Sequence, residues 1–385
     1  MTTMTVTETL TPIAAAAPLA KPAPTFDDAI SVSVVDPTTV PAELKDLFDL
    51  LRADAKAIYA ANILPSFGNT PAMPNGGHLG SVILNACLAH QAANNELLCR
   101  DPLSIAFDYL APTNMGPAFV VVRNNTRGGR KSGMQDVQAD MFQLQEVKTR
   151  DADAPRVQLL VQTIRSSALF GTFSTKGPSA AYSDHFGPRP PLEDTPAPHP
   201  KSWYLPPKVA MLSHQLDLLV HPETERRPRA DYWIRFHPPG VPLQQFDAGG
   251  VPEDYVPPAG PLVKNSLTLP LRAPSARRVD LAALPTFADF RRPAMENVLK
   301  KDACSPFDEP TRKWAYPTLS LTLRFLRPLA AAPGEVNPEW LYVGWREQAL
   351  NGRVTSEFKM ENENGEAICV GSMDTIMLPI EWFKM

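Results

Sequence analysis

Two stretches in the first half of the chain show hydrophobic patterns of different kinds. Residues His78 to Ala92 form a mostly apolar run, rich in Ala and Leu, whose length favours a buried helix over a strand. Residues Leu103 to Leu110 instead alternate and are followed by Pro112, which predicts a strand with a firm end. Weaker alternation at 29–35 and further patterns at 118–122, 132–144 and 157–173 predict the other strands. The first half is therefore predicted to hold a strand, a long helix and an antiparallel meander.

The second half repeats this order of elements. A helix-like segment at 287–301 precedes a strand that ends at Pro328. Further strands are predicted at 340–349, 354–360 and 367–378, with a hairpin turn at Asn351-Gly352. When Leu103–Pro112 is set over Leu319–Pro328, four of ten positions are identical and the apolar residues share one parity. Chance rarely preserves the order of flanking elements as well, so we infer an internal repeat.

The repeat has a direct structural consequence. A long apolar helix needs cover on nearly every side, and a strongly curved antiparallel sheet wrapped around it supplies that cover. One such sheet leaves an exposed edge, which is hidden when two copies pair edge to edge. The sequence therefore predicts an α+β protein with a double hot-dog fold, in which two fused repeats each wrap a curved antiparallel sheet around a long central helix.

Proline, of which the chain has 42 residues, marks the predicted boundaries. Because proline fixes φ and lacks an amide donor, its clusters favour extended connections over helices or strands. The predicted organisation is a disordered tail at 1–25, a first repeat at 26–175, a proline-rich linker at 176–208 and a second repeat at 209–385. The tail lacks the basic start of a secretory signal.

The charge balance and the cysteine pattern narrow the classes of function. A formal net charge of −4 over 385 residues gives no bulk electrostatic reason to bind nucleic acid or an anionic membrane. The four cysteines form no CxxC pair and no histidine spacing completes a metal site, so neither a metal nor another cofactor is expected. No apolar run suits a membrane-spanning helix, and the few cysteines favour a reduced, cytoplasmic protein.

Several short motifs resemble the double hot-dog acyl-CoA thioesterase II family. They are the helix start Gly76-Gly77-His78-Leu79, the two strands ending in Leu-x-Pro, the Tyr232–Arg235 segment and the closing Gly365–Ser372. The resemblance covers about Ala29 to Leu378 without the proline-rich connections. It implies a hydrolase whose substrate is an acyl thioester, either acyl-CoA or an acyl or polyketide chain on a carrier protein.

The resemblance also implies a site in which an Asp, a Ser or Thr and a Gln surround one water. Asp289 occupies the place of the Asp near the start of the second helix, and Thr318 occupies that of the Ser or Thr. The last strand has no Gln, and either Met373 or Asp374 stands in its place. We predict Asp289, Thr318 and Asp374 as the catalytic residues.

The chemistry of thioester hydrolysis explains these choices. It needs a held water, a group that takes its proton and donors for the oxyanion. Asp289 suits the second role, although a carboxylate at a helix N-terminus is less basic and a plain N-cap is the alternative. Thr318 is expected to share a strand face with Ser320 and Thr322, and a solvated face is its alternative. Asp374 as a second carboxylate would raise one pKa, which suits a general base, unless it is an ordinary surface residue.

Gly76, Gly77 and His78 are predicted to bind substrate. The glycines permit close approach of a ligand or backbone, and helix-start amides suit a carbonyl or an oxyanion. A lone His at a helix start is, however, more often a structural residue. No second site is expected in the first repeat, because Pro102 stands where Thr318 stands in the second.

Other functions compete with hydrolysis. Dehydration of a 3-hydroxyacyl thioester needs a His before the helix and an acid on it, and Ser66 and Asn85 stand there instead. The long proline-rich inserts and the missing Gln favour recruitment to another reaction on an acyl or polyketide chain in specialised metabolism. A non-catalytic acyl-binding module is a further alternative. A homo-oligomer is plausible because hot-dog proteins bury sheet edges by association, but the fused repeat already supplies one such pairing.

Overall fold

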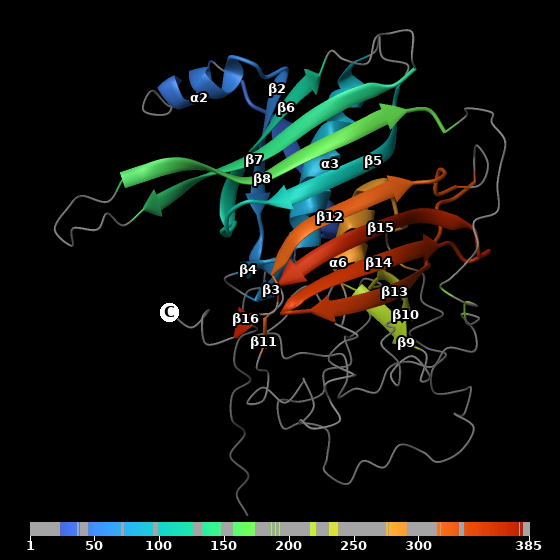
Figure 1. Ribbon diagram of the computed structural model, residues 1–385. Helices are drawn as coiled ribbons and strands as arrows, with labels where there is room; N and C mark the ends of the chain where they lie inside the picture. Colours follow the sequence, from blue (N-terminus) through green and yellow to red (C-terminus); the bar gives the residue numbers. More distant parts are fainter. Residues whose placement is uncertain are drawn as a thin grey trace, which may run out of the picture.

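One large sheet carries strands from both halves of the chain in the computed structural model (Figure 1). The structure describes residues 24–36, 38, 45–70, 73–94, 99–125, 133–147, 157–173, 186, 189, 192, 216–220, 231–237, 275, 277–290, 314–315, 317–330, 335–376 and 378–379. Nearly all of the predicted tail and most of the predicted linker lie outside these residues, so the predicted boundaries stay predictions.

The strands of the large sheet form two groups. The first half supplies β1 (Val32–Val34), β2 (Ala57–Ile63), β5 (Asp101–Tyr109), β6 (Gly116–Asn125), β7 (Gln135–Val147) and β8 (Val157–Gly171). The second half supplies β9 (Leu216–Val220), β10 (Asp231–Phe236), β12 (Thr318–Phe325), β13 (Leu341–Leu350), β14 (Arg353–Glu361) and β15 (Ala367–Ile376). Across the 12-stranded sheet the order is β1-β2-β6-β7-β8-β5-β12-β15-β14-β13-β10-β9. Two short ribbons pair β3 (Gly68–Thr70) with β4 (Met73–Pro74), and β11 (Trp314–Ala315) with β16 (Leu378–Pro379).

The helices in the described part of the chain are mostly short. They are α1 (Phe26–Ile30), α2 (Lys45–Arg52), α3 (Gly76–Ala93) and α6 (Leu284–Asp289), with 3₁₀ turns η3 (Pro65–Phe67) and η6 (Leu281–Ala283). Figure 1 shows α3 and α6 next to each other on the same side of the sheet, and the two helices pack directly together. We call this helix-bearing side the inner face. The site described below lies where these two helices meet.

The long helix α3 is the predicted central helix of the first repeat, and the structure confirms it. Asn75 caps its start, because its side-chain oxygen accepts the His78 amide at 2.9 Å. Val82, Leu84 and Cys87 have no exposed surface, as expected for a helix that is apolar on most of its sides. Burial raises the pKa of Cys87 to about 12, so this thiol stays protonated inside the core.

The two repeats join through the antiparallel pair β5–β12. Ala106 pairs with Thr322, and these two residues are also equivalent when Leu103–Pro112 is set over Leu319–Pro328. Pairing of a residue with its own repeat counterpart is the signature of a two-fold relation, as in a symmetric dimer interface. The chain therefore builds within itself the edge-to-edge pairing that the repeat predicted.

Two local predictions differ from the structure. The segment 29–35 was predicted as one strand, but it holds the end of α1 and the short strand β1. Thr25 starts α1 with a capping box, in which its hydroxyl accepts the Asp28 amide and the Asp28 carboxylate accepts the Thr25 amide. The helix predicted at 287–301 corresponds to α6, which begins at Leu284 and ends at Asp289, and residues 291–300 lie outside the described part.

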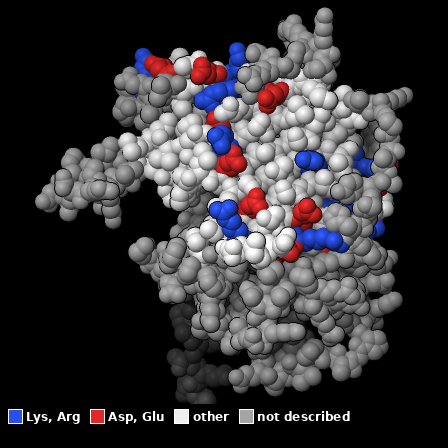
Figure 2. Space-filling model, in the orientation of Figure 1, with Lys and Arg blue, Asp and Glu red and all other residues white. Residues whose placement is uncertain are grey.

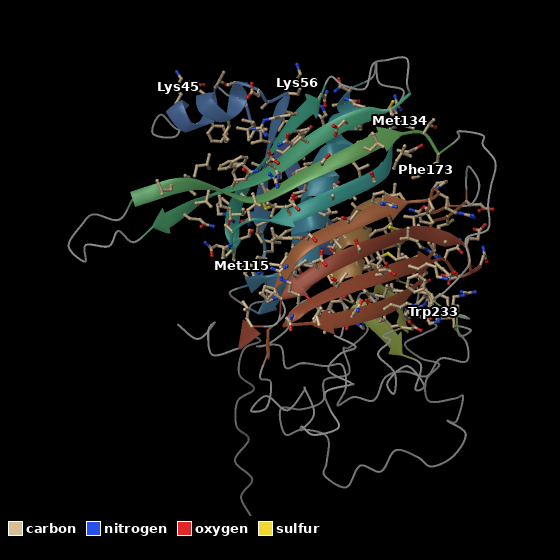
Figure 3. All side chains as sticks on the ribbon, in the orientation of Figure 1. Lys45, Lys56, Met115, Met134, Phe173 and Trp233 are labelled. Atoms are coloured by element: carbon tan, nitrogen blue, oxygen red, sulfur yellow. The ribbon has the colours of Figure 1, made fainter. Side chains whose placement is uncertain are left out.

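The outer face of the sheet, opposite α3, is also covered by side chains (Figure 3). Helix α2 packs Phe48 and Leu51 against Ile58 and Val121 there.

On the side shown in Figure 2, the described Lys and Arg residues alternate with Asp and Glu residues and form no large area of one sign. This distribution agrees with a chain that is close to electrically balanced overall.

Candidate active site

Asp289 is the last residue of α6 and lies against the first turn of α3. Its Oδ2 atom accepts a hydrogen bond from the Gly77 amide at 2.8 Å, and its Oδ1 atom accepts one from the Thr318 hydroxyl at 2.9 Å. Three segments far apart in the sequence therefore meet at one carboxylate. The structure brings Asp289 and Thr318 together as expected and adds the Gly77 amide to them, whereas their catalytic and binding roles stay predictions.

The helix end that faces the Asp289 carboxylate belongs to α3. The sequence placed Asp289 near the start of its own helix, but in the described residues it is at the end of α6. The first amides of α3 have no intrahelical acceptor and carry the positive end of the helix dipole. The first repeat thus stabilises a negative charge that the second repeat supplies.

Glycine at the start of α3 is required by the closeness of α6. A Cβ atom on Gly77 would lie 2.2 Å from the Pro285 carbonyl oxygen and 2.5 Å from the Asp289 Cβ. A Cβ atom on Gly76 would lie 3.1 Å from Asp289 Oδ2 and 3.4 Å from the Thr318 side chain. The predicted close approach is therefore of a neighbouring helix, and at Gly76 also of the Thr318 side chain.

A β-bulge turns Thr318 toward the helices. Thr318 pairs with Thr375, but the next residue pair is Ser320 with Asp374, so β12 holds an extra residue, Leu319, relative to β15. Such a bulge reverses the alternation of side chains on the strand and often re-aims one of them next to an active site. The prediction that Thr318 shares a face with Ser320 was therefore wrong, and Thr318 points to the side of Asp289 instead.

Met373 occupies the third position of the site. It pairs with Leu321, and both side chains are fully buried on the inner face. The Thr318 hydroxyl lies 3.9 Å from Met373 Sδ, which is a far weaker acceptor than the Asp289 carboxylate. Of the two residues that the sequence offered for this place, the structure brings Met373 there.

Asp374 faces the other side of the sheet. Its Oδ2 atom accepts the Ser320 hydroxyl at 3.0 Å, and its Oδ1 atom accepts the Thr355 hydroxyl at 2.9 Å, on the exposed outer face. The expected grouping of Asp374 with Asp289 and Thr318 does not form, because neighbouring residues of a strand point to opposite faces. The ordinary surface-carboxylate alternative describes Asp374 better.

Tyr109, at the end of β5, supports the start of α3. Its hydroxyl donates a hydrogen bond to the Gly76 carbonyl oxygen at 2.7 Å. Burial, and secondly the negative charge of Asp289, raise the pKa of Tyr109 well above its ordinary value, so it stays a neutral donor. Sequence reasoning placed Tyr109 on a strand but gave no reason to connect it with Gly76.

A second polar contact between the helices also escaped the sequence analysis. The Ser81 and Thr286 hydroxyls lie 2.8 Å apart, and the Thr286 amide donates to Ser81 Oγ at 3.2 Å, with both residues buried. These bonds fix α6 along α3 one turn away from Gly77. Their only sequence signal is a small polar residue on each of two apolar segments.

His78 lies in an aromatic environment. Its ring stacks on Phe67 at 5.1 Å between centroids and meets Phe26 edge-on at 6.1 Å. It is fully buried, and neither ring nitrogen has a hydrogen-bond partner among the described residues. Burial lowers its pKa to about 3, which keeps the ring neutral. Its predicted substrate contact stays a prediction, and its surroundings are those of a core residue.

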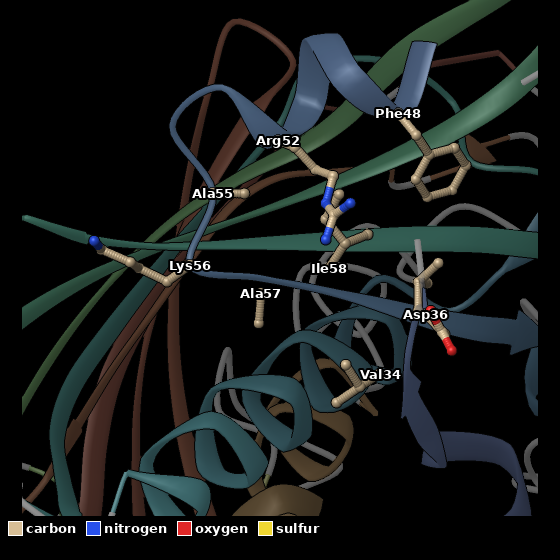
Figure 4. A pocket seen from close by; sticks show the side chains of 9 residues that line it. Val34, Asp36, Phe48, Arg52, Ala55, Lys56, Ala57 and Ile58 are labelled. Carbon is tan, nitrogen blue, oxygen red and sulfur yellow. The ribbon is translucent and has the colours of Figure 1, made fainter. Parts of the chain in front are cut away.

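A separate hollow lies beside α2, the edge strand β1 and its neighbour β2 (Figure 4). It has a volume of about 510 Å³, and its wall combines the cations Arg52 and Lys56 with apolar residues such as Phe48 and Ile58. Among its described lining residues is none of the predicted site residues Gly76, Gly77, His78, Asp289, Thr318 and Asp374. The hollow is thus distinct from the place where Asp289 and Thr318 meet.

The described part of the chain contains no group of three or more His, Cys, Asp or Glu residues that could hold a metal ion. Nor does any helix within it combine the length and the apolar character needed to cross a membrane.

Comparison with known proteins identifies the family. The profile of the acyl-CoA thioesterase N-terminal domain matches residues 64–164, which span α3 and β5. The Ustilagic acid biosynthesis cluster protein orf2 of Mycosarcoma maydis is 37% identical over 367 residues, covering 93% of this chain and 88% of that protein. The chain belongs to the acyl-CoA thioesterase II-like family.

Solved structures agree with the fold of the thioesterase II-like family. A conserved hot-dog protein of unknown function from Alicyclobacillus acidocaldarius matches with a TM-score of 0.55 at 16% identity, covering 92% of this chain and 97% of that one. A putative thioesterase II from Thermobifida fusca matches with a TM-score of 0.55 at 15% identity, covering 91% and 98%. The predicted double hot-dog fold is thereby confirmed.

Proposed function

We propose that this thioesterase II-like protein cleaves the thioester bond of an acyl chain carried by CoA or by a carrier protein. Asp289 serves as the general base that takes a proton from the attacking hydroxyl group, which is water in the simplest case. Thr318 positions that group beside the carboxylate. The observation that carries the proposal is the fixed Asp289 carboxylate, held at one oxygen by an amide and at the other by a hydroxyl.

The surroundings of the carboxylate suit this chemistry. Two hydrogen bonds at 2.8 and 2.9 Å fix the orientation of Asp289, which is the main requirement for a base that acts in one direction. Gly76 lets the Thr318 and Asp289 side chains lie close against the start of α3, and its amide is one of the helix-start donors suited to an oxyanion. The acyl carbonyl is therefore proposed to lie beside Gly76.

A second candidate is a reaction in specialised metabolism that uses the same site. Two observations favour it over the turnover of ordinary acyl-CoA. Met373 gives the site a thioether where a polar side chain was expected, and the 37% identical relative is named for a biosynthesis cluster. Both candidates begin with attack on an acyl thioester, so one experiment tests their common step.

That experiment measures free thiol released from acyl-CoA substrates of 2 to about 16 carbons by the wild-type protein and by Asp289→Asn. The amide keeps the size of the side chain but cannot take the proton, so thiol release should fall by about 100-fold or more. The matched control is Asp108→Asn, a carboxamide on the exposed outer face of β5, where Asp108 binds Arg165. It should retain wild-type turnover.

The alternatives give different results in the same experiment. Acyl-CoA binding without thiol release would support a non-catalytic acyl-binding module instead. Equal turnover by Asp289→Asn and the wild type would remove Asp289 from the mechanism. Carrier-bound chains are tested in parallel with an acyl group on a phosphopantetheinylated carrier protein, because CoA and carrier share the same thioester.

A further inference from the structure

Different kinds of side chain surround the Asp289 carboxylate and Thr318 in the described part of the chain. Thr318 and the Gly77 amide approach the carboxylate from two directions at 2.9 and 2.8 Å. On the β15 side of Thr318 stand its cross-strand partner Thr375 and Met373, whose thioether is 3.9 Å from the Thr318 hydroxyl and which has no exposed surface. Among the described residues, Met373 therefore gives an apolar, polarisable part to the wall of the place where an attacking group would meet Thr318 and Asp289.

Water and an alcohol differ in what they require from such a place. A buried water is typically held by about three hydrogen bonds, and a site that offers fewer polar partners holds it poorly. An alcohol has a single O–H donor and, directly next to it, a carbon that prefers apolar contact. The Asp289 carboxylate suits the donor, and the Met373 thioether, which donates nothing and accepts weakly, suits the carbon.

We infer that the acyl group is transferred to the hydroxyl group of an organic acceptor, a primary or secondary alcohol, in preference to water. This inference rests on the proposed function, because it uses the same thioester and the same base. It assigns Met373 as the residue that selects the acceptor.

The transfer step balances without any further reactant. Asp289 takes the proton of the acceptor O–H, and the acceptor oxygen forms a bond to the thioester carbon. The resulting oxyanion reforms the carbonyl as the C–S bond breaks, and the thiolate receives the proton that Asp289 holds. A thioester and an alcohol thus become an ester and a thiol, and Asp289 returns to its starting state. No electron is gained or lost.

The test measures how the acyl group is divided between ester and free acid. Wild-type protein is incubated with decanoyl-CoA and increasing concentrations of 1-butanol, glycerol or methyl glucoside, and both products are quantified by mass spectrometry beside free thiol. For at least one acceptor, the ratio of ester to free acid should clearly exceed the molar ratio of that alcohol to water. Asp289→Asn should lose the ester and the thiol together.

Met373→Gln and Met373→Leu separate the role of Met373 from a general packing effect. Glutamine has nearly the same length but offers an amide donor and an acceptor to a water, so the ester-to-acid ratio should fall at least tenfold. Leucine keeps the wall apolar and should preserve the ratio even if total turnover changes. Circular dichroism and thermal unfolding identify any variant that has failed to fold.

The other outcomes are distinguishable. If the wild type releases thiol but gives only acid with every acceptor, transfer to an alcohol is overturned and hydrolysis stands. If the wild type gives ester but Met373→Gln leaves the ester-to-acid ratio unchanged, Met373 does not select the acceptor. If the wild type releases no thiol with or without acceptor, the transfer and the proposed thioester cleavage fail together.

Discussion

The beginnings of β5 and β12 share a backbone but differ in their chemistry. In β5 the residue pairs Pro102–Phe170 and Ser104–Leu169 flank a bulge of the same form as that at Thr318 in β12. When β5 is aligned with β12, Pro102 corresponds to Thr318, and their cross-strand partners Phe170 and Thr375 also correspond. The duplicated strand has kept its irregular geometry, and the first repeat has filled it with apolar side chains.

The same correspondence extends to the third position. Ala168 of β8 pairs with Ile105 in the way that Met373 of β15 pairs with Leu321. Ala168 and Met373 are both buried, but the alanine side chain is too short to line a site in the first repeat. The first repeat contributes structure in another place, through the Gly77 amide and Tyr109. The candidate site is thus composite, with the Gly77 amide and Tyr109 from one repeat and the Asp289 and Thr318 side chains from the other.

Thr318 corresponds to Pro102 of the first repeat, and among the variants that test this contrast its replacement has the largest expected effect. Thr318→Val keeps the shape and removes the hydroxyl that binds Asp289 Oδ1. Loss of a hydrogen bond to a charged group should lower kcat/KM for thiol release by about 10- to 100-fold. Thr318→Ser should restore most of this activity because it returns the hydroxyl.

Thr322 provides the matched control on the same strand. It lies beyond the bulge, pairs with Ala106 at the junction of the repeats and with Ser372 of β15, and is only partly buried. Thr322→Val should leave kcat/KM within about twofold of wild type, as is usual for a surface substitution. Equal losses in the Thr318→Val and Thr322→Val variants would mean that a general disturbance of β12, and not the hydroxyl, lowers activity.

The sequence predicted the architecture better than the site. Alternation in Leu103–Leu110 and the apolar run from His78 were sufficient for the repeat and the central helix, because burial periodicity is a local property. The bulge at Leu319 was invisible, since that residue continues the apolar alternation and only its pairing with β15 reveals the extra residue. The false grouping of Thr318 with Ser320 follows from that one missed residue. Asp374 was chosen for a different reason, because the sequence left Met373 and Asp374 open and a second carboxylate suited a general base.

Contacts between distant segments were beyond sequence reasoning for a different reason. The Gly77–Asp289 hydrogen bond joins residues 212 positions apart. Family resemblance pointed to Asp289, but only the packing of α6 on α3 shows which helix end stabilises its charge. Tyr109 has the same difficulty, because its place on β5 says nothing of the Gly76 carbonyl that it binds.

Replacing His78 tests whether the first repeat takes part in the reaction as well as in the structure. The buried ring also predicts that the unfolding free energy depends on pH. Burial lowers its pKa from 6.5 to about 3, so as the pH falls the unfolded chain takes up the proton before the folded protein does. The stability that this neutral ring contributes is therefore complete above pH 6.5 and is lost progressively toward pH 3. Between pH 7 and pH 5 one such group costs about 2 kcal/mol of unfolding free energy.

Urea unfolding of the wild type and His78→Leu at pH 7 and pH 5 measures this effect. The variant should lose about 2 kcal/mol less over this range than the wild type, and it should still release thiol from acyl-CoA at pH 7. Identical pH dependence of the two proteins would contradict the buried, neutral state. A stable His78→Leu protein without turnover would instead support the predicted substrate contact, and the first repeat would then hold reactive groups too.

Asp374 has the smallest expected effect and tests the division between the two faces of the sheet. Its carboxylate accepts the Ser320 and Thr355 hydroxyls at 3.0 and 2.9 Å on the outer face, away from Met373 and Thr318. Asp374→Asn retains an acceptor for one of these hydroxyls, so the unfolding free energy should change by no more than about 1 kcal/mol. Thiol release should stay within about twofold of wild type. A loss comparable to that of Thr318→Val would show that the outer face takes part in the reaction. The turn of Thr318 to the inner face at the bulge would then not be enough to explain why the two repeats differ.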